Sequence, residues 1–243
     1  MVSGDHDPAA GQPLRIETHV DAAAVARRAA AWIAEVAGQA IKDRGRFVVA
    51  LSGGHSPGET LRLLATEVVD WRNVHIVQVD ERVAPGGSPD RNLTQLRDAL
   101  LARVPVPAGQ VYAMPVDAPN LAAAADGYGR LLGGLAGSPP VLDLVHLGLG
   151  VDGHTASLVP GDAALDVTSA EVAVTARYNG WRRMTLTFPL INRARHILWL
   201  AAGAEKSAVV ARLVRADPSI PASRINRASA LLLVDQAAAA GLV

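Results

Sequence analysis

The feature that most constrains the fold of this chain is a series of short, mainly apolar runs that each end in a polar or glycine-rich cluster. Phe47–Leu51, His75–Val79 and Leu142–Leu147 are such runs, followed directly by Ser-Gly-Gly, Asp-Glu-Arg and Gly-Leu-Gly. A strand that is apolar along most of its length is typical of a parallel sheet that is covered on both faces. We therefore expect buried strands whose carboxyl ends carry polar side chains.

Segments with helical periodicity alternate with these strands. In the first, from Asp21 to Lys42, the apolar residues fall on one helical face: Val25, Ala29, Trp32, Ile33, Val36 and Ala40. Further helices are predicted at 59–69, 92–101 and 120–135 and from Glu205 and Gln236, and further strands at 184–188, 197–201 and 231–234. The alternation predicts an α/β fold, with a mostly parallel sheet and helices on both faces.

The predicted domain organisation is simple. No low-complexity linker divides the chain after residue 14, so residues 14–243 are expected to form one α/β domain, with room for a small subdomain inserted around residues 150–190. Met1–Pro13 contains Gly, Pro, Asp and His without an apolar core. This composition predicts a disordered tail rather than a signal peptide or a membrane span.

Composition excludes several classes of function. Lysine plus arginine (23) balances aspartate plus glutamate (23), so no net charge would attract nucleic acid or an anionic membrane. The absence of cysteine excludes disulfides, thiolate catalysis and cysteine-ligated metal centres. We expect a cytoplasmic protein whose partner is a small molecule, acting as a monomer or a small homo-oligomer.

Ser52-Gly53-Gly54 follows the first strand and precedes a helix. Glycines let the backbone approach a ligand closely, and the free N–H groups at a helix start favour an anion. The segment lacks both the Gly-Lys-Ser/Thr of a Walker loop and the GxGxxG of a dinucleotide site. It is interpreted either as an anion-binding turn or as a tight strand-to-helix turn.

Charged residues lie at the ends of other predicted elements. If the second strand persists through Asp80-Glu81-Arg82, alternation directs Asp80 and Arg82 to one side and Glu81 to the other. Arg183 opens a later strand and Lys206 lies near a helix start, which suits phosphate binding. The alternative for each of these residues is ordinary solvated charge.

The loop Gly148–Ser157 is the most informative segment. Three glycines in six residues, directly after a buried strand, imply backbone conformations that other residues resist. Asp152 and His154 lie two residues apart, so the carboxylate can orient the imidazole and raise its basicity. A metal site is the alternative, but one Asp and one His fall short of the usual three or four ligands. The pair therefore predicts a general base and no metal.

Five motifs in order resemble the motif series of the 6-phosphogluconolactonases, within the superfamily of glucosamine- and galactosamine-6-phosphate isomerases. They are Leu51–Pro57, Val79–Arg82, Pro89–Asn92, Leu147–Ser157 and Arg183–Thr187, and Ile220–Ser223 followed by Asp235–Ala238 resembles the family's carboxyl end. Five motifs in order are far more specific than any one of them. The resemblance covers residue 14 to the C-terminus and implies a Rossmann-like α/β domain.

The resemblance also implies an activity: hydrolysis of 6-phosphoglucono-δ-lactone to 6-phosphogluconate in the oxidative pentose phosphate pathway, with no obligatory cofactor. Carried over residue by residue, it implies His154 as the base, Asp152 as its neighbour and Arg82 as a substrate-facing cation. The residues implied in substrate and phosphate binding are Ser52, Gly53, Gly54, Asp80, Arg183 and Lys206. Arg82 or a backbone N–H of the glycine loop would stabilise the oxyanion.

The chain departs from the family's pattern at a few positions. His55 and Ser56 stand where the family usually has Ser or Thr, and Arg91 stands where it has Ser. Asn179–Arg182 replaces a proline-rich approach to the Arg-x-Thr motif, so either Arg182 or Arg183 is expected to meet the phosphate.

There are two alternative functions, and the second of them belongs to another class of protein. An amino-sugar phosphate isomerase or deaminase would use Asp80 to abstract a proton beside a carbonyl. In those enzymes the histidine is followed by Ile-Ala-Phe-Asn-Glu, whereas His154 is followed by Thr155–Val159, which lacks the Asn-Glu pair. A non-catalytic sugar-phosphate sensor would carry a DNA-binding segment, and no basic patch for one is present. The lactonase is therefore favoured.

Overall fold

A computed structural model describes residues 14–53 and 55–242. The predicted tail Met1–Pro13 and the predicted anion-binding residue Gly54 lie outside the described residues. Among the residues that are described, no helix has both the length and the apolar character needed to cross a bilayer.

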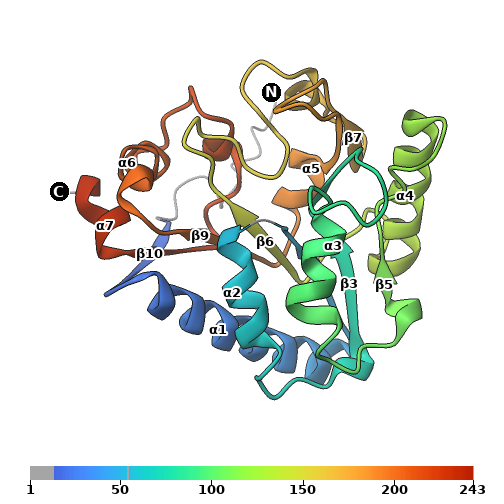
Figure 1. Ribbon diagram of the computed structural model, residues 1–243, viewed down its shortest axis with the longest axis horizontal. Helices are drawn as coiled ribbons and strands as arrows, with labels where there is room; N and C mark the ends of the chain where they lie inside the picture. The colour runs from blue at the N-terminus through green and yellow to red at the C-terminus, as the bar shows by residue number, and fades with distance from the viewer. Residues whose placement is uncertain (1–13, 54, 243) are drawn as a thin grey trace, which may run out of the picture.

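A parallel sheet forms the centre of the fold (Figure 1). Within the described residues its seven strands run in the order β1-β10-β9-β6-β2-β3-β5, and each neighbouring pair is parallel. Their bounds are β1 (Arg15–His19), β10 (Ala230–Asp235), β9 (His196–Ala201), β6 (Leu144–Gly148), β2 (Phe47–Leu51), β3 (Val74–Gln78) and β5 (Val111–Tyr112). The predicted α/β fold with a mostly parallel sheet is confirmed.

Alternation along each strand sends side chains into two separate cores, one on each face of the sheet. In β2, Phe47, Val49 and Leu51 pack into one core, and Val48 and Ala50 into the other. The first core contains side chains of α1 (Ala22–Arg44), α2 (His55–Leu64) and α3 (Asn92–Leu96), and the second those of α4 (Leu121–Ala136), α5 (Phe188–Asn192), α6 (Ser207–Val214) and α7 (Gln236–Ala239). Helices therefore cover both faces, which explains why the strands are apolar throughout.

Both ends of the longest described helix, α1, are set by capping residues. The Asp21 carboxylate accepts a hydrogen bond of 2.7 Å from the backbone N–H of Ala24, which caps the first turn. Gly45 follows the last turn with φ of +74° and donates its N–H to Ile41 O, a left-handed end that glycine adopts readily. In Figure 1, α1 and α2 lie beside each other against the sheet.

A second, smaller sheet lies against the second core. Its strands β4 (Asp80–Arg82), β8 (Arg183–Leu186) and β7 (Val172–Val174) are antiparallel in the order β4-β8-β7. β7 and β8 come from the region where an inserted subdomain was expected, but β4 is the direct continuation of β3. Asp80 therefore faces Thr185 and Arg82 faces Arg183 across the small sheet. The two sheets share apolar contacts in one core.

Some predicted element ends are wrong, for identifiable reasons. The predicted strand 184–188 ends at Leu186, because Pro189 lies in the first turn of α5, where proline is favoured. The predicted helix 59–69 spans His55–Leu64 instead. The helix predicted from Glu205 begins as a 3₁₀ turn at Ala204–Lys206, and α6 follows it. The helix predicted at 92–101 is α3 followed by a π-helical segment, Arg97–Leu101.

The sheet order also locates the place where a ligand is expected. From β2 the chain adds strands outward through β3 to β5, and from β6 it adds them in the opposite direction through β9 and β10. The order thus reverses between β2 and β6, which are direct neighbours. Open α/β sheets bind ligands beyond the carboxyl ends of the strands at such a reversal.

Candidate active site

A cavity of ≈ 260 Å³ opens at the carboxyl ends of β2 and β6. Residues predicted for the site that line it are Ser52, Gly53, Asp80, Arg82, His154, Arg183 and Lys206. Asp152 does not line the cavity but forms a hydrogen bond with His154, which does. Gly54 lies outside the described residues. The polar clusters predicted at three strand ends therefore meet in one place.

His154 and Asp152 form a hydrogen-bonded pair. His154 Nδ1 lies 2.6 Å from Asp152 Oδ1, which also accepts the backbone N–H of His154 at 3.2 Å. Partial burial raises the pKa of Asp152, but the hydrogen bonds and charge of His154 and the hydroxyl of Tyr178 outweigh it and lower the pKa. The carboxylate is thus ionised and holds the proton on Nδ1. Nε2 has no hydrogen-bond partner among the described residues, which leaves it available as a base.

In the glycine loop, the backbone of Gly150 lies very close to the His154 ring. Gly150 accepts the N–H of Gly153 and donates its own N–H to His154 O, both at 2.9 Å. A Cβ at Gly150 would collide with the His154 ring and would lie 2.6 Å from Asp152 Oδ1. No other residue type could stand at position 150 without moving the pair. Of the three loop glycines only Gly153 has a positive φ, +88°, so glycine is needed at position 150 for the space that the His154 ring occupies.

Asp80 is a second carboxylate of the cavity, and it is only 6% exposed. Its Oδ2 accepts the Ser157 hydroxyl at 2.5 Å, and Asn92 Nδ2 donates to its backbone oxygen at 2.9 Å and to its Oδ1 at 3.2 Å. Burial raises the pKa of Asp80, although Ser157 and the charge of Arg183 act in the opposite direction. Asn92 also packs against Gly53, where any Cβ would lie 2.6 Å from Asn92 Cβ.

Glu81 points away from the cavity, as the predicted alternation requires. It is fully buried, and its carboxylate accepts the backbone N–H groups of Arg82, Asn92 and Leu93 and the side-chain amide of Gln78. Four donors around one buried carboxylate fix β4 relative to the start of α3. Arg82 and Asp80 are therefore held on the cavity side.

Arg183 lines the cavity, and its neighbour Arg182 is exposed and does not. Only 6% of Arg183 is exposed, and its Nη1 lies 4.0 Å from Asp80 Oδ2. Its hydrogen bonds to Ser157 Oγ and Tyr178 O are long, both 3.4 Å, and Nε has no hydrogen-bond partner among the described residues. A buried guanidinium with unused donors is suited to an incoming anion.

Lys206 and Arg82 complete the positive lining. Lys206 lies in the 3₁₀ turn before α6, and its Nζ donates to Leu149 O at 2.7 Å. Arg82 is partly buried and donates through Nη1 to Asp90 O at 2.8 Å. With Arg183, the described lining of the cavity has three cations against the single carboxylate of Asp80. This balance favours a ligand that carries more than one negative charge.

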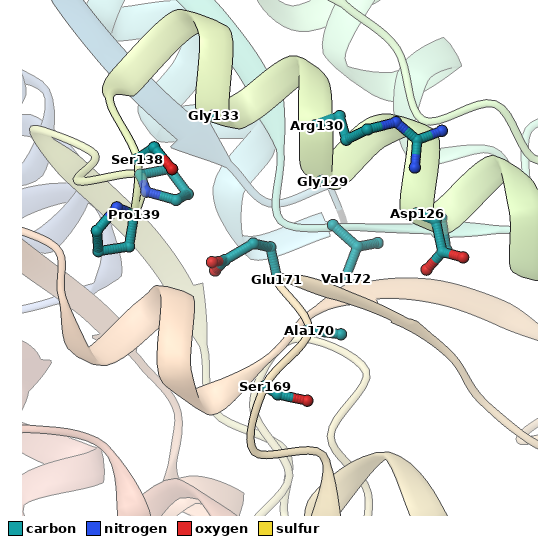
Figure 2. Close-up of a pocket in the computed structure, with 12 residues that line it drawn as sticks. Asp126, Gly129, Arg130, Gly133, Ser138, Pro139, Ser169, Ala170, Glu171 and Val172 are labelled. Atoms are coloured by element: carbon teal, nitrogen blue, oxygen red, sulfur yellow. The ribbon is translucent and has the colours of Figure 1, made fainter.

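A second, larger groove of ≈ 740 Å³ lies between α4 and the segment that leads into β7 (Figure 2). Figure 2 shows Gly129 and Gly133 of α4 facing this segment, with Glu171 below them. None of the predicted site residues lines the groove, and Glu171 is paired with Arg193. Within the described residues, no group of three or more His, Cys, Asp or Glu side chains is arranged to hold a metal ion. The residues predicted for the site therefore line the smaller cavity and not this groove.

Three residues at the site were not assigned a role from the sequence: Asn92, Ser157 and Tyr178. Asn92 and Ser157 lie inside motifs that the resemblance uses, so their positions in those motifs were the available signal. Tyr178 directly precedes Asn179–Arg182, the segment where the chain departs from the family's pattern. No periodicity or spacing connects Tyr178 to Asp152, which it contacts.

Comparisons with known proteins agree on one family. Residues 20–234 match the family of glucosamine-6-phosphate isomerases/6-phosphogluconolactonase. The 6-phosphogluconolactonase of Synechocystis sp. is 38% identical over 212 residues, covering 84% of this chain and 88% of the relative. That of Mycobacterium tuberculosis is 38% identical over 219 residues, covering 84% and 89%.

Solved structures show the same relationship. The 6-phosphogluconolactonase of Trypanosoma brucei superposes with a TM-score of 0.82 at 29% identity, covering 96% of this chain and 99% of that structure. A monomeric glucosamine-6-phosphate deaminase, at 20% identity, shares the fold with a TM-score of 0.83 over 94% of this chain and 100% of its own. On the match over most of its length and the identity to these relatives, the chain belongs to the glucosamine-6-phosphate isomerase/6-phosphogluconolactonase family.

Proposed function

We propose that this chain is a hydrolase that opens 6-phosphoglucono-δ-lactone to 6-phosphogluconate, a step of the oxidative pentose phosphate pathway. The observation that carries the proposal is the His154–Asp152 pair facing a cavity whose lining includes Arg82, Arg183 and Lys206. The names of the relatives at 38% identity support the same reaction. A base beside a cluster of cations is what the hydrolysis of a phosphorylated ester needs.

In this mechanism His154 acts as the general base. Its Nε2 takes a proton from a water molecule while the water oxygen forms a bond to the lactone carbonyl carbon. Asp152 holds the Nδ1 proton and stabilises the imidazolium that results. The C–O bond of the ring then breaks, and the ring oxygen leaves with the proton that His154 returns. A base of this kind contributes about 10²–10⁴-fold, which is sufficient for an activated ester that also opens in water.

The charged lining has a separate part in the proposal. Arg183 and Lys206 bind the phosphate together with the backbone of Ser52 and Gly53, because a buried guanidinium and an ammonium form charge-assisted hydrogen bonds with phosphate oxygens. Arg82, or a backbone N–H of the glycine loop, stabilises the oxyanion that forms at the carbonyl. Asp80 contacts substrate hydroxyls and balances the charge of Arg183 at 4.0 Å.

The amino-sugar phosphate deaminase is the second candidate, and one observation weighs against it. The deaminase fold is the same, so the fold alone does not separate the two reactions. In this chain the residues after His154 make internal contacts instead of supplying an Asn-Glu pair: Thr155 donates to Gly148 O, and Ser157 donates to Asp80. Residues 155–159 contain no carboxylate that could assist ring opening of an amino sugar.

The test is to add purified protein to fresh 6-phosphoglucono-δ-lactone in the presence of a strong chelator and to compare the rate of acid release with the spontaneous rate. Acceleration that is far weaker with unphosphorylated glucono-δ-lactone supports both the reaction and the phosphate site. Ammonia release from glucosamine 6-phosphate, without lactone hydrolysis, would replace the proposal by the second candidate. Activity lost on chelation and restored by zinc would make Asp152 and His154 metal ligands instead.

Two further predictions accompany this function. We infer that residues 14–243 form one domain, because the small sheet and the large sheet bury their apolar side chains in a shared core. A cytoplasmic location is expected of an enzyme that acts on a sugar phosphate formed inside the cell.

A further inference from the structure

Tyr178 forms a tight hairpin with the first residues of Asn179–Arg182, the segment that departs from the family's pattern. Tyr178 donates its N–H to Trp181 O at 2.9 Å, and Trp181 donates back to Tyr178 O at 3.3 Å. Between them Asn179 and Gly180 both have positive φ angles, 50° and 85°. Asn-Gly in this conformation is the favoured two-residue turn of a β-hairpin. The turn fixes where the Tyr178 side chain points.

Tyr178 contacts the Asp152–His154 pair and also Arg183. Its hydroxyl donates to Asp152 Oδ2 at 3.1 Å, and its ring meets the His154 ring edge-on, with centroids 5.5 Å apart. The Arg183 guanidinium lies over the same ring at 5.1 Å from its centroid. Arg183 Nη2 also donates to Tyr178 O at 3.4 Å. A single side chain therefore touches the proposed base pair and the proposed phosphate-binding arginine.

We propose that Tyr178 is a positioning residue that orients the Asp152–His154 pair and seats Arg183 for the reaction. The inference rests on the proposed function and adds to it a residue that acts through others. Asp152 has two carboxylate oxygens, and each has its own partner: Oδ1 faces His154 and Oδ2 faces Tyr178. With both oxygens engaged, the carboxylate plane is fixed, and the imidazole is held in the orientation that directs Nε2 away from Asp152.

The hydroxyl of Tyr178 stays a donor under working conditions. Burial raises the pKa of Tyr178, and the hydrogen bond and charge of Asp152 raise it further, while Arg183 lowers it. The phenol is therefore protonated at neutral pH and donates to the ionised Asp152. This hydrogen bond draws the negative charge of the carboxylate toward Oδ2. It therefore weakens the electrostatic attraction between Asp152 and a protonated His154 ring.

Removing the hydroxyl should have an effect of known sign on the base. Without the Tyr178 donor, Asp152 interacts more strongly with an imidazolium at position 154, which favours the protonated ring. The other charged groups that face the same cavity are Asp80, Arg82, Arg183 and Lys206, and none of them is altered by the substitution. A Tyr178→Phe variant should therefore need a higher pH to become active.

The experiment compares Tyr178→Phe with the wild type in kcat, KM and the pH profile of kcat/KM. We expect kcat to fall about 10-fold through the loss of one hydrogen bond to a charged group, KM to change little, and the acid limb to move to higher pH. In the absence of substrate, the NMR titration of the His154 ring should move its midpoint in the same direction. The matched control is Tyr112→Phe, because Tyr112 OH also contacts a histidine, His75 Nδ1 at 3.0 Å, but lies outside the cavity.

A second variant separates the ring from the hydroxyl. Tyr178→Leu removes the face over which Arg183 lies, so it should raise KM for the phosphorylated lactone several-fold beyond the effect of Tyr178→Phe. An acid limb and an NMR midpoint of Tyr178→Phe that coincide with those of the wild type would overturn the proposal, whatever the loss of kcat. If the wild type itself does not hydrolyse the lactone, the proposed function fails, whereas the NMR comparison still decides whether Tyr178 acts on His154.

Discussion

Ser157 Oγ lies 2.5 Å from Asp80 Oδ2, although 77 positions separate the two residues in the sequence. Ser157 ends the glycine-rich loop after β6, and Asp80 begins β4. Both side chains are buried, and Arg183 lies beside the pair, with Nη1 3.4 Å from the serine oxygen. This contact fastens the loop that carries His154 to the small sheet that carries Arg82 and Arg183.

The first prediction concerns this hydrogen bond. Ser157→Ala leaves one oxygen of the buried Asp80 carboxylate without its hydroxyl partner, so the free energy of unfolding should fall by about 1–3 kcal/mol. Urea unfolding at neutral pH measures the change. Ser169→Ala, at an exposed serine of the groove in Figure 2, is the control and should stay within about 0.5 kcal/mol of the wild type. Equal stabilities of Ser157→Ala and the control would contradict the role of the contact.

The second prediction assigns the phosphate-binding arginine. Arg183→Ala or Lys206→Ala should raise KM for the phosphorylated lactone by one or more orders of magnitude, since a charge-assisted contact is worth roughly 1.5–3 kcal/mol. Arg182→Ala removes an exposed neighbour of the same charge and should leave KM near that of the wild type. Steady-state kinetics distinguish the variants. A rise in KM for Arg182→Ala alone would transfer the role to that residue.

The third prediction tests the base. His154→Asn keeps a polar side chain next to Asp152 but cannot take up a proton, so kcat should fall by about 10²-fold or more while KM changes little. His75→Asn, at a histidine outside the cavity, is the control. A folded His154→Asn enzyme with kcat within a few-fold of the wild type would end the assignment, and Asp80 would be the next carboxylate to test.

The fourth prediction uses the glycine beneath His154. Gly150→Ala introduces a Cβ into the space occupied by the His154 ring, so the ring must move, and kcat should fall by about 10²-fold as the base leaves its position. Gly134→Ala on α4 meets no atom within 4 Å and should leave kcat unchanged. Thermal melts of both variants show whether the fold is retained. Wild-type kcat in Gly150→Ala would mean that the ring position does not matter for the reaction.

The fifth prediction is a pH dependence of stability. His146 on β6 is fully buried, and burial lowers its pKa from 6.5 to about 4. Because the unfolded chain binds this proton more readily, the stability present above pH 6.5 is lost as the pH falls toward 4. Between pH 7.5 and pH 5 this one group should cost about 2 kcal/mol of unfolding free energy. His146→Leu should lose that part of the pH dependence in urea titrations, and parallel curves for both proteins would contradict it.

Much of the fold could be predicted because its signals are local. Buried strands such as β2 are short apolar runs, and α1 carries both an apolar face and the capping residue Asp21. β1 and β5 were not predicted, for physical reasons. β1 is an edge strand of mixed polarity, and β5 has only two residues. Their pairing depends on neighbours far away in the sequence, which no local pattern reveals.

The site likewise contains residues that could be predicted from local sequence and residues that could not. His154, Asp152 and Asp80 stand at strand ends, and the rule that parallel strands end at one edge of a sheet is enough to bring them together. Ser157 and Tyr178 make contacts between segments that are distant in the sequence: Ser157 contacts Asp80, and Tyr178 contacts Asp152. Arg183 could not be distinguished from Arg182 by sequence, because only the register of β8 against β4 decides which of the two is buried. Such choices depend on tertiary packing.

The position of β1 in the sheet affects how the chain folds as it is synthesised. β1 pairs with β10, so Arg15 lies opposite Leu231 and His19 opposite Asp235. Among the described strands β1 is translated first, and it has no partner strand until more than two hundred further residues have been translated. Helix α1 and strands β2 and β3 can assemble early, whereas that edge of the sheet closes last. Long-range pairing of this kind slows folding and leaves an unpaired edge exposed meanwhile. Nascent chains that stall before residue 230 would keep that edge open to chaperones and to aggregation.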